Sequence, residues 1–237
     1  MFFKRKEFND PKLFKSLVDL EAMKHRAEKP KKQPSLIREL ISVIGAALIL
    51  SILVRTFLIQ AFYVPSASME DTLQRNDRIV VSKISTKLTG INRTDVIVFH
   101  DPGNWLGENF PNPYDNPVGK ILQFVGILPA NSGNDLVKRV IGVGGDQIEC
   151  CDANGALLVN GQPVDEPFLV EGTMSNQVAF KVLVPENHVF VMGDNRANSE
   201  DSRYHFDVNN GMVPLSEVIG RVVVRIWPLD RIGGIEN

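Results

Sequence analysis

The stretch LISVIGAALILSILVRTFLIQAFYV, residues 40–64, determines the architecture of this 237-residue chain. Its uninterrupted apolar part, residues 41–54, would cover only ~21 Å as a helix, less than the ~30 Å hydrocarbon core of a bilayer. A helix that continues through Arg55 and Gln60 is long enough, because a cationic side chain near the interface can reach the headgroups. We therefore predict one transmembrane helix over residues 40–63.

The charges on either side of this helix predict its orientation. Residues 1–39 carry eleven lysines and arginines against six aspartates and glutamates, whereas only two arginines closely follow the apolar run. Cytoplasmic flanks are enriched in lysine and arginine, so we expect a basic cytoplasmic head and a single-pass protein of the cell membrane. Residues 64–237 then form an extracytoplasmic domain. A cleaved signal peptide is the competing interpretation, but the basic region and the apolar run are both too long for one.

Beyond the apolar run, the sequence consists of short β-branched segments separated by prolines and glycines. Residues 146–164, DQIECCDANGALLVNGQPV, predict two strands with one turn between them and an Asn-Gly turn after them. No long helical periodicity follows residue 64. We predict a mainly β domain, built as folded-over antiparallel sheets or a partly open barrel. Further strands are predicted over residues 78–84, 95–100, 188–195 and 220–229.

One apolar segment of the outer domain has two possible interpretations. Residues 118–130, VGKILQFVGILPA, are too short to span a bilayer. The segment is either part of the hydrophobic core or a membrane-associating patch that dips into the lipid interface.

Composition argues against several kinds of ligand. The net charge of -2 lacks the excess of basic residues that is typical of proteins that bind nucleic acid. The histidines and the two cysteines lack the spacing of zinc ligands, so we expect no metal. Cys150 and Cys151 are adjacent, and neighbouring side chains on a strand point to opposite faces. A bridge between them would be strained, so we predict two small, partly buried apolar side chains.

A serine nucleophile needs a base, and the sequence offers two kinds. His25 falls on the cytoplasmic side, and neither His188 nor His205 lies in a triad context. A lysine can be the base if burial keeps its amine neutral, because a reference pKa of ~10.4 leaves well under ~1% neutral at pH 8. Lys138 has apolar neighbours on a predicted strand, DLVKRVIGVGGD (135–146). A lysine there is, by itself, also typical of a solvated strand.

Four motifs together resemble one protein family. PSASM (65–69), RTDVIVF (93–99), KRVIGVGGD (138–146) and GDNRANSEDSR (193–203) occur in this order over about 140 residues, directly after the apolar run. They resemble the conserved blocks of bacterial type I signal peptidases, the membrane-bound serine endopeptidases that remove signal peptides from exported preproteins. The resemblance implies preprotein signal peptides and the lipid bilayer as partners, and no cofactor.

The resemblance also implies the roles of individual residues. Ser68 matches the family's nucleophile, and Lys138 matches its general base. Ser66 matches the residue whose hydroxyl joins the Ser68 backbone N–H in the oxyanion hole. Ser199 matches a serine that orients the lysine amine. Five further residues match the polar scaffold around the family's site: Arg139, Asp194, Arg196, Asp201 and Arg203.

The expected reaction is cleavage after small-x-small (Ala-x-Ala) sites, with substrate pocket walls over residues 62–70, 79–84 and 95–99. Two other classes of function remain open. One is a related Ser-Lys peptidase with a different substrate, such as the pilin-system type. The other is a non-enzymatic anchored β-domain, which predicts that Ser68 and Lys138 lie far apart.

Overall fold

The computed structural model describes most of the chain outside the basic head. The predicted head, residues 1–39, lies almost entirely outside the described residues, as do His25 and part of the segment 118–130. The chain divides into two compact units, residues 1–46 and 47–237. The described residues are 35–106, 115–124, 128–129, 134–170 and 172–235, together with Lys15 and Asp19.

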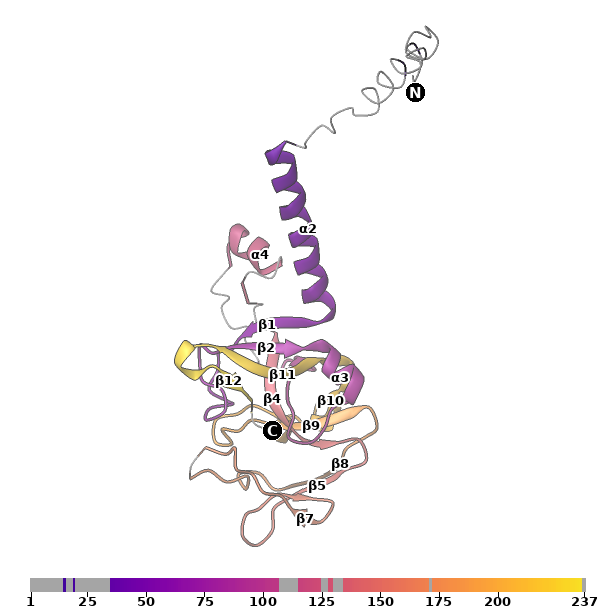
Figure 1. Ribbon diagram of the computed structural model, residues 1–237. Coiled ribbons are helices and arrows are strands. Elements are labelled where there is room, and N and C mark those ends of the chain that lie inside the picture. The colour runs from indigo at the N-terminus through magenta and orange to yellow at the C-terminus, as the bar shows by residue number, and fades with distance from the viewer. Residues whose placement is uncertain are drawn as a thin grey trace, which may run out of the picture. The chain divides into compact units, whose positions relative to one another are not determined.

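The apolar run forms a single helix, α2, over Leu36–Phe57 (Figure 1). Its 22 residues cover ~33 Å, and none of them is buried. Among the described residues it is the one helix long and apolar enough to cross a membrane. The helix begins and ends earlier than the predicted 40–63, because Ile59–Tyr63 forms strand β1. Pairing with β2, Arg78–Ser82, and burial of Phe62 in the core stabilise the extended conformation there.

The larger sheet has eight strands in the described residues, in the order β1-β2-β11-β3-β4-β9-β10, with β12 paired to β11. Every pairing in it is antiparallel, which confirms the predicted fold class. Register shifts in β11 and β4 bend these strands, and such bulges increase local twist so that the sheet curls into a partly open barrel. The remaining bounds are β3 Val96–His100, β4 Asp135–Val143, β9 His188–Met192, β10 Val213–Pro214, β11 Val218–Trp227 and β12 Gly233–Gly234.

A smaller sheet of four strands follows the order β7-β6-β5-β8. The predicted Asn-Gly turn is confirmed: Asn160 and Gly161 have φ of 54° and 77°, and they join β6 to β7. Positive φ at both central residues is what a tight hairpin turn of this kind requires. The bounds are β5 Gln147–Cys150, β6 Leu158–Val159, β7 Gln162–Pro163 and β8 Phe180–Leu183.

The prediction of two unbridged cysteines is wrong, because Cys150 and Cys151 form a disulfide with each other. Strand β5 ends at Cys150, so the alternation of side chains along a strand does not extend to Cys151. Cys150 packs in the core beneath the smaller sheet.

The other helices are short, as the absence of a long helical period predicts. Helix α3 follows β2, and the Ser82 hydroxyl caps it by accepting a hydrogen bond from the Ser85 N–H. The bounds are α3 Lys83–Thr89, α4 Pro117–Phe124, η1 Ser202–Tyr204, η2 Asn209–Gly211, η3 Leu215–Glu217 and η4 Leu229–Arg231.

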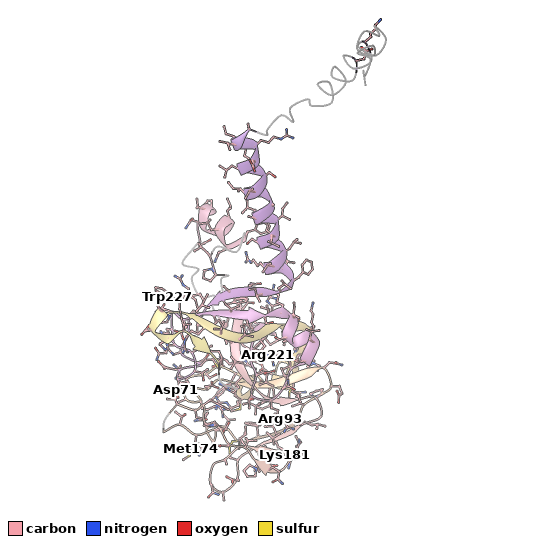
Figure 2. All side chains as sticks on the ribbon, viewed as in Figure 1. Asp71, Arg93, Met174, Lys181, Arg221 and Trp227 are labelled. Atoms are coloured by element: carbon pink, nitrogen blue, oxygen red, sulfur yellow. A yellow bond between two sulfur atoms is a disulfide. The ribbon has the colours of Figure 1, made fainter. Side chains whose placement is uncertain are left out.

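Two ion pairs hold the chain segment that leads into β3. Arg93 pairs with Asp146, beyond the end of β4, and Arg221 of β11 pairs with Asp95 (both arginines are labelled in Figure 2). The Arg93 hydrogen bond contributes to a pKa of about 2 for Asp146, against the opposing effect of burial. The start of β3 is therefore tied both to the end of β4 and to β11.

Candidate active site

Ser68 lies in the loop between β1 and β2, and this loop is held against the end of β9. The side chains of Met69 and Leu73 are buried in the core beneath it. The Asn195 N–H donates to the Ser68 carbonyl at 3.1 Å, and the Asn195 side-chain amide donates to the Ala67 carbonyl at 3.2 Å. The backbone on both sides of the serine hydroxyl is therefore positioned by a distant part of the chain.

Lys138 lies in the middle of β4 and reaches this serine. Its side chain is buried, and its Nζ donates to the Ser68 Oγ at 2.6 Å. Burial lowers the pKa of Lys138 to about 8, while the carboxylates of Asp201, Asp194 and Glu200 act in the opposite direction. The structure thus joins a serine hydroxyl to an amine that is half neutral near pH 8.

A narrow cavity opens beside these two side chains. The Ser66 Oγ lies 3.3 Å from the Ser68 Oγ, on the cavity wall. The cavity measures about 20 Å³, enough for one water molecule or a methyl-sized group. Of the predicted walls, only 62–70 contributes to it. Its described lining is Val64, Pro65, Ser66, Ser68, Met69, Leu106, Asp135, Leu136, Val137 and Lys138.

The carboxylate in this wall has a histidine partner. Asp135 lies opposite His100 on β3, and the His100 Nδ1 is 2.7 Å from the Asp135 Oδ1. Burial raises the pKa of Asp135, and the hydrogen bond with His100 opposes that effect. Sequence reasoning missed both residues, because neither belongs to a motif.

Gly193, at the end of β9, permits the close approach of three segments. A Cβ at this position would lie 2.3 Å from the Ser199 Oγ and 2.4 Å from the Ser68 carbonyl oxygen. Ser199 is itself buried, and its hydroxyl helps to hold the pKa of Asp201 below its ordinary value. The structure thus brings Ser199 to the site, and its role in orienting the lysine stays a prediction.

Arg139 follows Lys138 along β4 and lies in a different network. Its guanidinium donates to both carboxylate oxygens of Asp194, at 2.9 and 2.8 Å, and to the Thr94 carbonyl at 2.8 Å. It also lies 4.0 Å from the centroid of the Phe168 ring. The Thr72 hydroxyl donates to the same carboxylate at 2.6 Å. Arg139 and Asp194 thus connect β4, the end of β9 and the serine loop.

The other scaffold residues surround the turn after β9. Asp201 accepts from the Gly193 N–H at 3.0 Å and from Arg203 at 2.9 Å. Burial opposes ionisation of Asp201, but these hydrogen bonds and the charge of Arg203 outweigh it and lower its pKa. Arg196 donates to the Gly193 carbonyl at 2.8 Å and pairs with Glu166 at 2.7 Å. All predicted scaffold residues are therefore buried around one turn.

Several of these positioning residues were missed from the sequence. Asn195 stands inside the motif GDNRANSEDSR, so that block was a usable signal for it. Thr72, Glu166 and Phe168 stand outside the four motifs, and nothing in their local sequence indicates the site.

The described histidines have partners of their own. The His188 Nδ1 contacts the Glu186 carbonyl at 2.9 Å, and the His205 Nε2 lies 3.2 Å from a Glu200 carboxylate oxygen. The His205 ring also stacks on Trp105 at 4.7 Å. Within the described ranges, no group of three His, Cys, Asp or Glu side chains is placed to hold a metal ion. Lysine is thus the basic side chain in contact with Ser68.

Comparison with known families covers most of the chain. A family model described as "Signal peptidase, peptidase S26" matches residues 37–227, which include the whole candidate site and all of α2 except its first residue.

Curated relatives match over most of their length. The probable signal peptidase I of Mycobacterium leprae is 38% identical over 240 residues, which cover 87% of this chain and 81% of that protein. The signal peptidase I of Leptolyngbya laminosa is 37% identical over 207 residues, covering 87% of each chain. The signal peptidase I of Mycobacterium tuberculosis is 36% identical over 243 residues, covering 92% and 82%.

Proposed function

The chain belongs to the signal peptidase family, peptidase S26, and we propose that it is a serine endopeptidase in which Ser68 and Lys138 form the catalytic dyad. The observation that carries this proposal is the 2.6 Å contact between the Lys138 Nζ and the Ser68 Oγ. The burial that lowers the pKa of Lys138 to about 8 gives this amine the neutral form that a base needs.

In the proposed reaction, neutral Lys138 accepts the proton of the Ser68 hydroxyl as the oxygen attacks the scissile carbonyl. The same ammonium then donates a proton to the leaving amine, and water hydrolyses the acyl-enzyme. The oxyanion accepts hydrogen bonds from the Ser68 N–H and the Ser66 hydroxyl. One such donor is generally worth ~2.7–4 kcal/mol in the transition state.

The size of the cavity and the position of the serine support the proposed substrate class. The cavity beside Ser68 is about 20 Å³, which suits a methyl-sized side chain. This favours cleavage after small-x-small sites such as Ala-x-Ala. Ser68 follows the end of α2 by only eleven residues. A preprotein whose cleavage site closely follows its own apolar segment suits a nucleophile held there.

Membrane anchoring is the second part of the proposal. Helix α2 spans the bilayer once, with the lysine-rich residues 1–39 in the cytoplasm and the β domain outside. Its length of 22 residues supports this, since about 20 apolar residues are needed.

The test uses the full chain, purified in detergent, and a preprotein with an Ala-x-Ala site. Wild type is compared with Ser68→Ala and Lys138→Met, and Leu183→Ala is the matched control at an exposed position of β8. We expect both site variants to lose cleavage by roughly 10³-fold or more, while the control keeps it.

Other outcomes would contradict the role of a residue or support another function. Full activity in either site variant removes that residue from the dyad. Cleavage of unrelated peptides but not of the preprotein favours a Ser-Lys peptidase with a different substrate. The non-enzymatic alternative required Ser68 and Lys138 to be far apart, and their side chains are in contact.

A further inference from the structure

Helix α4 presents an apolar face that the β domain does not cover. Val118, Ile121 and Phe124 are 65%, 62% and 66% exposed, and their spacing puts them on one side of the helix. On the other side, Gly119 and Gln123 are buried. A helix with one face attached to the domain and three large apolar side chains exposed is not part of the hydrophobic core. The core interpretation is therefore wrong for residues 118–124. Residues 125–127 and 130 lie outside the described part of the chain.

The residues that attach α4 to the domain lie next to the outer end of α2. The Leu128 N–H donates to the Leu122 carbonyl at 3.1 Å, and the Gln123 amide donates to the Pro129 carbonyl at 2.8 Å. Leu128 in turn lines a cavity of about 160 Å³, whose other described walls are Ser51, Val54, Arg55, Ile59, Gln60, Ala61 and Val80. The segment that holds α4, residues 128–129, therefore adjoins the last turns of the proposed membrane helix.

Arg55 in the wall of this cavity, and two lysines near it, Lys83 and Lys87, indicate what surrounds the cavity. Within the described residues, the Arg55 Nη1 is buried without a hydrogen-bond partner. Burial lowers the pKa of Lys83, and the charges of Arg55 and Lys87 lower it further. A cluster of cations that repel one another suits an environment that supplies anions, and the phosphate groups of a bilayer do so. Apolar side chains next to cations at the level of headgroups are typical of an interfacial helix.

We propose that α4 is an interfacial membrane helix, which buries Val118, Ile121 and Phe124 among lipid chains beside the outer end of α2. The proposal rests on the membrane anchoring inferred above. Its consequence concerns the site, because the segment that carries α4 joins β3 to β4. Leu106 stands in this segment and Asp135 is the residue of β4 at its end, and both line the catalytic cavity. Lipid contact at α4 thus holds the wall of the substrate site at the bilayer surface.

The test places one environment-sensitive fluorophore at a time on the full-length protein in liposomes of phosphatidylcholine and phosphatidylglycerol. Cys150 and Cys151 are disulfide-bonded to each other and have no free thiol, so the fluorophore reacts with the introduced cysteine. The variants are Ile121→Cys on α4, Ile49→Cys on α2 and Leu183→Cys on β8, with native side chains that are 62%, 62% and 66% exposed. Figure 1 shows β8 at the end of the outer domain opposite to β1. Nitroxides on the lipid chains quench probes in the bilayer, and aqueous iodide quenches probes in water.

The expected result is that position 121 behaves like position 49. Both should be quenched by the lipid nitroxides, with iodide quenching roughly fivefold weaker than at position 183, because ions are excluded from the hydrocarbon region. A probe at 121 that iodide quenches as strongly as at 183 overturns the proposal and leaves the anchor intact. Protection at 121 that appears only after a signal peptide is added also overturns it, and assigns the face to substrate. Iodide access at 49 overturns the anchor and this proposal together.

Discussion

Lys138 and Arg139 are neighbours on one strand, carry the same kind of charge and are both buried, yet their surroundings differ. Arg139 has a bidentate carboxylate partner, a carbonyl acceptor and an aromatic ring over its guanidinium. Lys138 has a serine hydroxyl and no carboxylate in direct contact within the described residues. Alternation along β4 sends the two side chains to opposite faces, so each face receives a different set of neighbours.

The difference separates a structural cation from a reactive one. A buried charge with a complete set of partners stays charged and holds segments together. A buried amine that lacks a counterion becomes neutral more easily, and only the neutral form can accept a proton. The same strand therefore provides both the scaffold and the base, and the variants below test each side of that distinction.

The largest effect is expected for Lys138→Met. Cleavage should fall by roughly 10³-fold or more, because the base is lost. Stability should rise, since burying this amine lowers its pKa from 10.5 to about 8. The corresponding cost is about 3 kcal/mol when the unfolded chain is protonated. This destabilisation is fully present below pH 8 and falls to zero as the pH rises from 8 to 10.5. Thermal unfolding in detergent at pH 7 and above pH 10 measures it, and a destabilised variant at pH 7 would contradict it.

Arg139→Met should have the opposite effect on stability. It leaves the carboxylate of Asp194 buried without its cation, and breaking such a pair generally costs ~3–5 kcal/mol. The double variant Arg139→Met, Asp194→Asn should recover part of the loss, because the uncompensated charge is gone. Thermal unfolding of both variants is the measurement. An unchanged melting temperature for Arg139→Met would remove the distinction between the two cations.

Gly193→Ala tests the close contact between the serine loop and the turn after β9. The new methyl group would overlap the Ser68 carbonyl and the Ser199 hydroxyl, so the serine loop must shift. A displacement of about 1 Å can cost ~10²-fold in rate. We expect the loss mainly in kcat, with the protein still folded. Gly234→Ala, in β12, is the matched control, because nothing lies within 4 Å of its added Cβ and its φ is not in the left-handed region. Equal activity of both variants would show that close packing at Gly193 is not needed.

The smallest effect concerns the pH dependence. A base with a pKa of about 8 should make log kcat/KM rise with pH up to about 8 and then level off. The exposed carboxylate of Glu200 stabilises the Lys138 ammonium, so Glu200→Gln should move the rise to lower pH. Exposed charges are worth ~0.2–1 kcal/mol, or roughly 1.4- to fivefold in rate at pH 7. A shift to higher pH would contradict this sign.

The sequence predicted what local patterns determine. Strands over 78–84, 95–100 and 188–195, the Asn-Gly turn and the mainly β class all depend on short-range alternation and turn chemistry. The contact between Ser68 and Lys138 was reached through the family resemblance, because 70 residues separate the two side chains. No periodicity relates positions so far apart.

Other features were beyond prediction because they depend on pairing partners. The end of α2 was misplaced since Ile59–Tyr63 continues the apolar run without a proline or glycine to end the helix, and only pairing with β2 makes it a strand. The role of Thr72 and Phe168 arises where distant loops converge on Arg139. The pairing of His100 with Asp135 likewise needs the register of β3 with β4.

The neutral amine of Lys138 also has a consequence for chemical labelling. At pH 8 about half of it is unprotonated, whereas an ordinary lysine is well under ~1% unprotonated. Amines react with electrophiles only in the unprotonated form, so this side chain is enriched about a hundredfold in reactive amine over exposed lysines. The cavity of about 20 Å³ beside it admits only a small reagent such as cyanate. One lysine of the wild-type chain can thus be carbamylated selectively, and a peptide in the site would protect it.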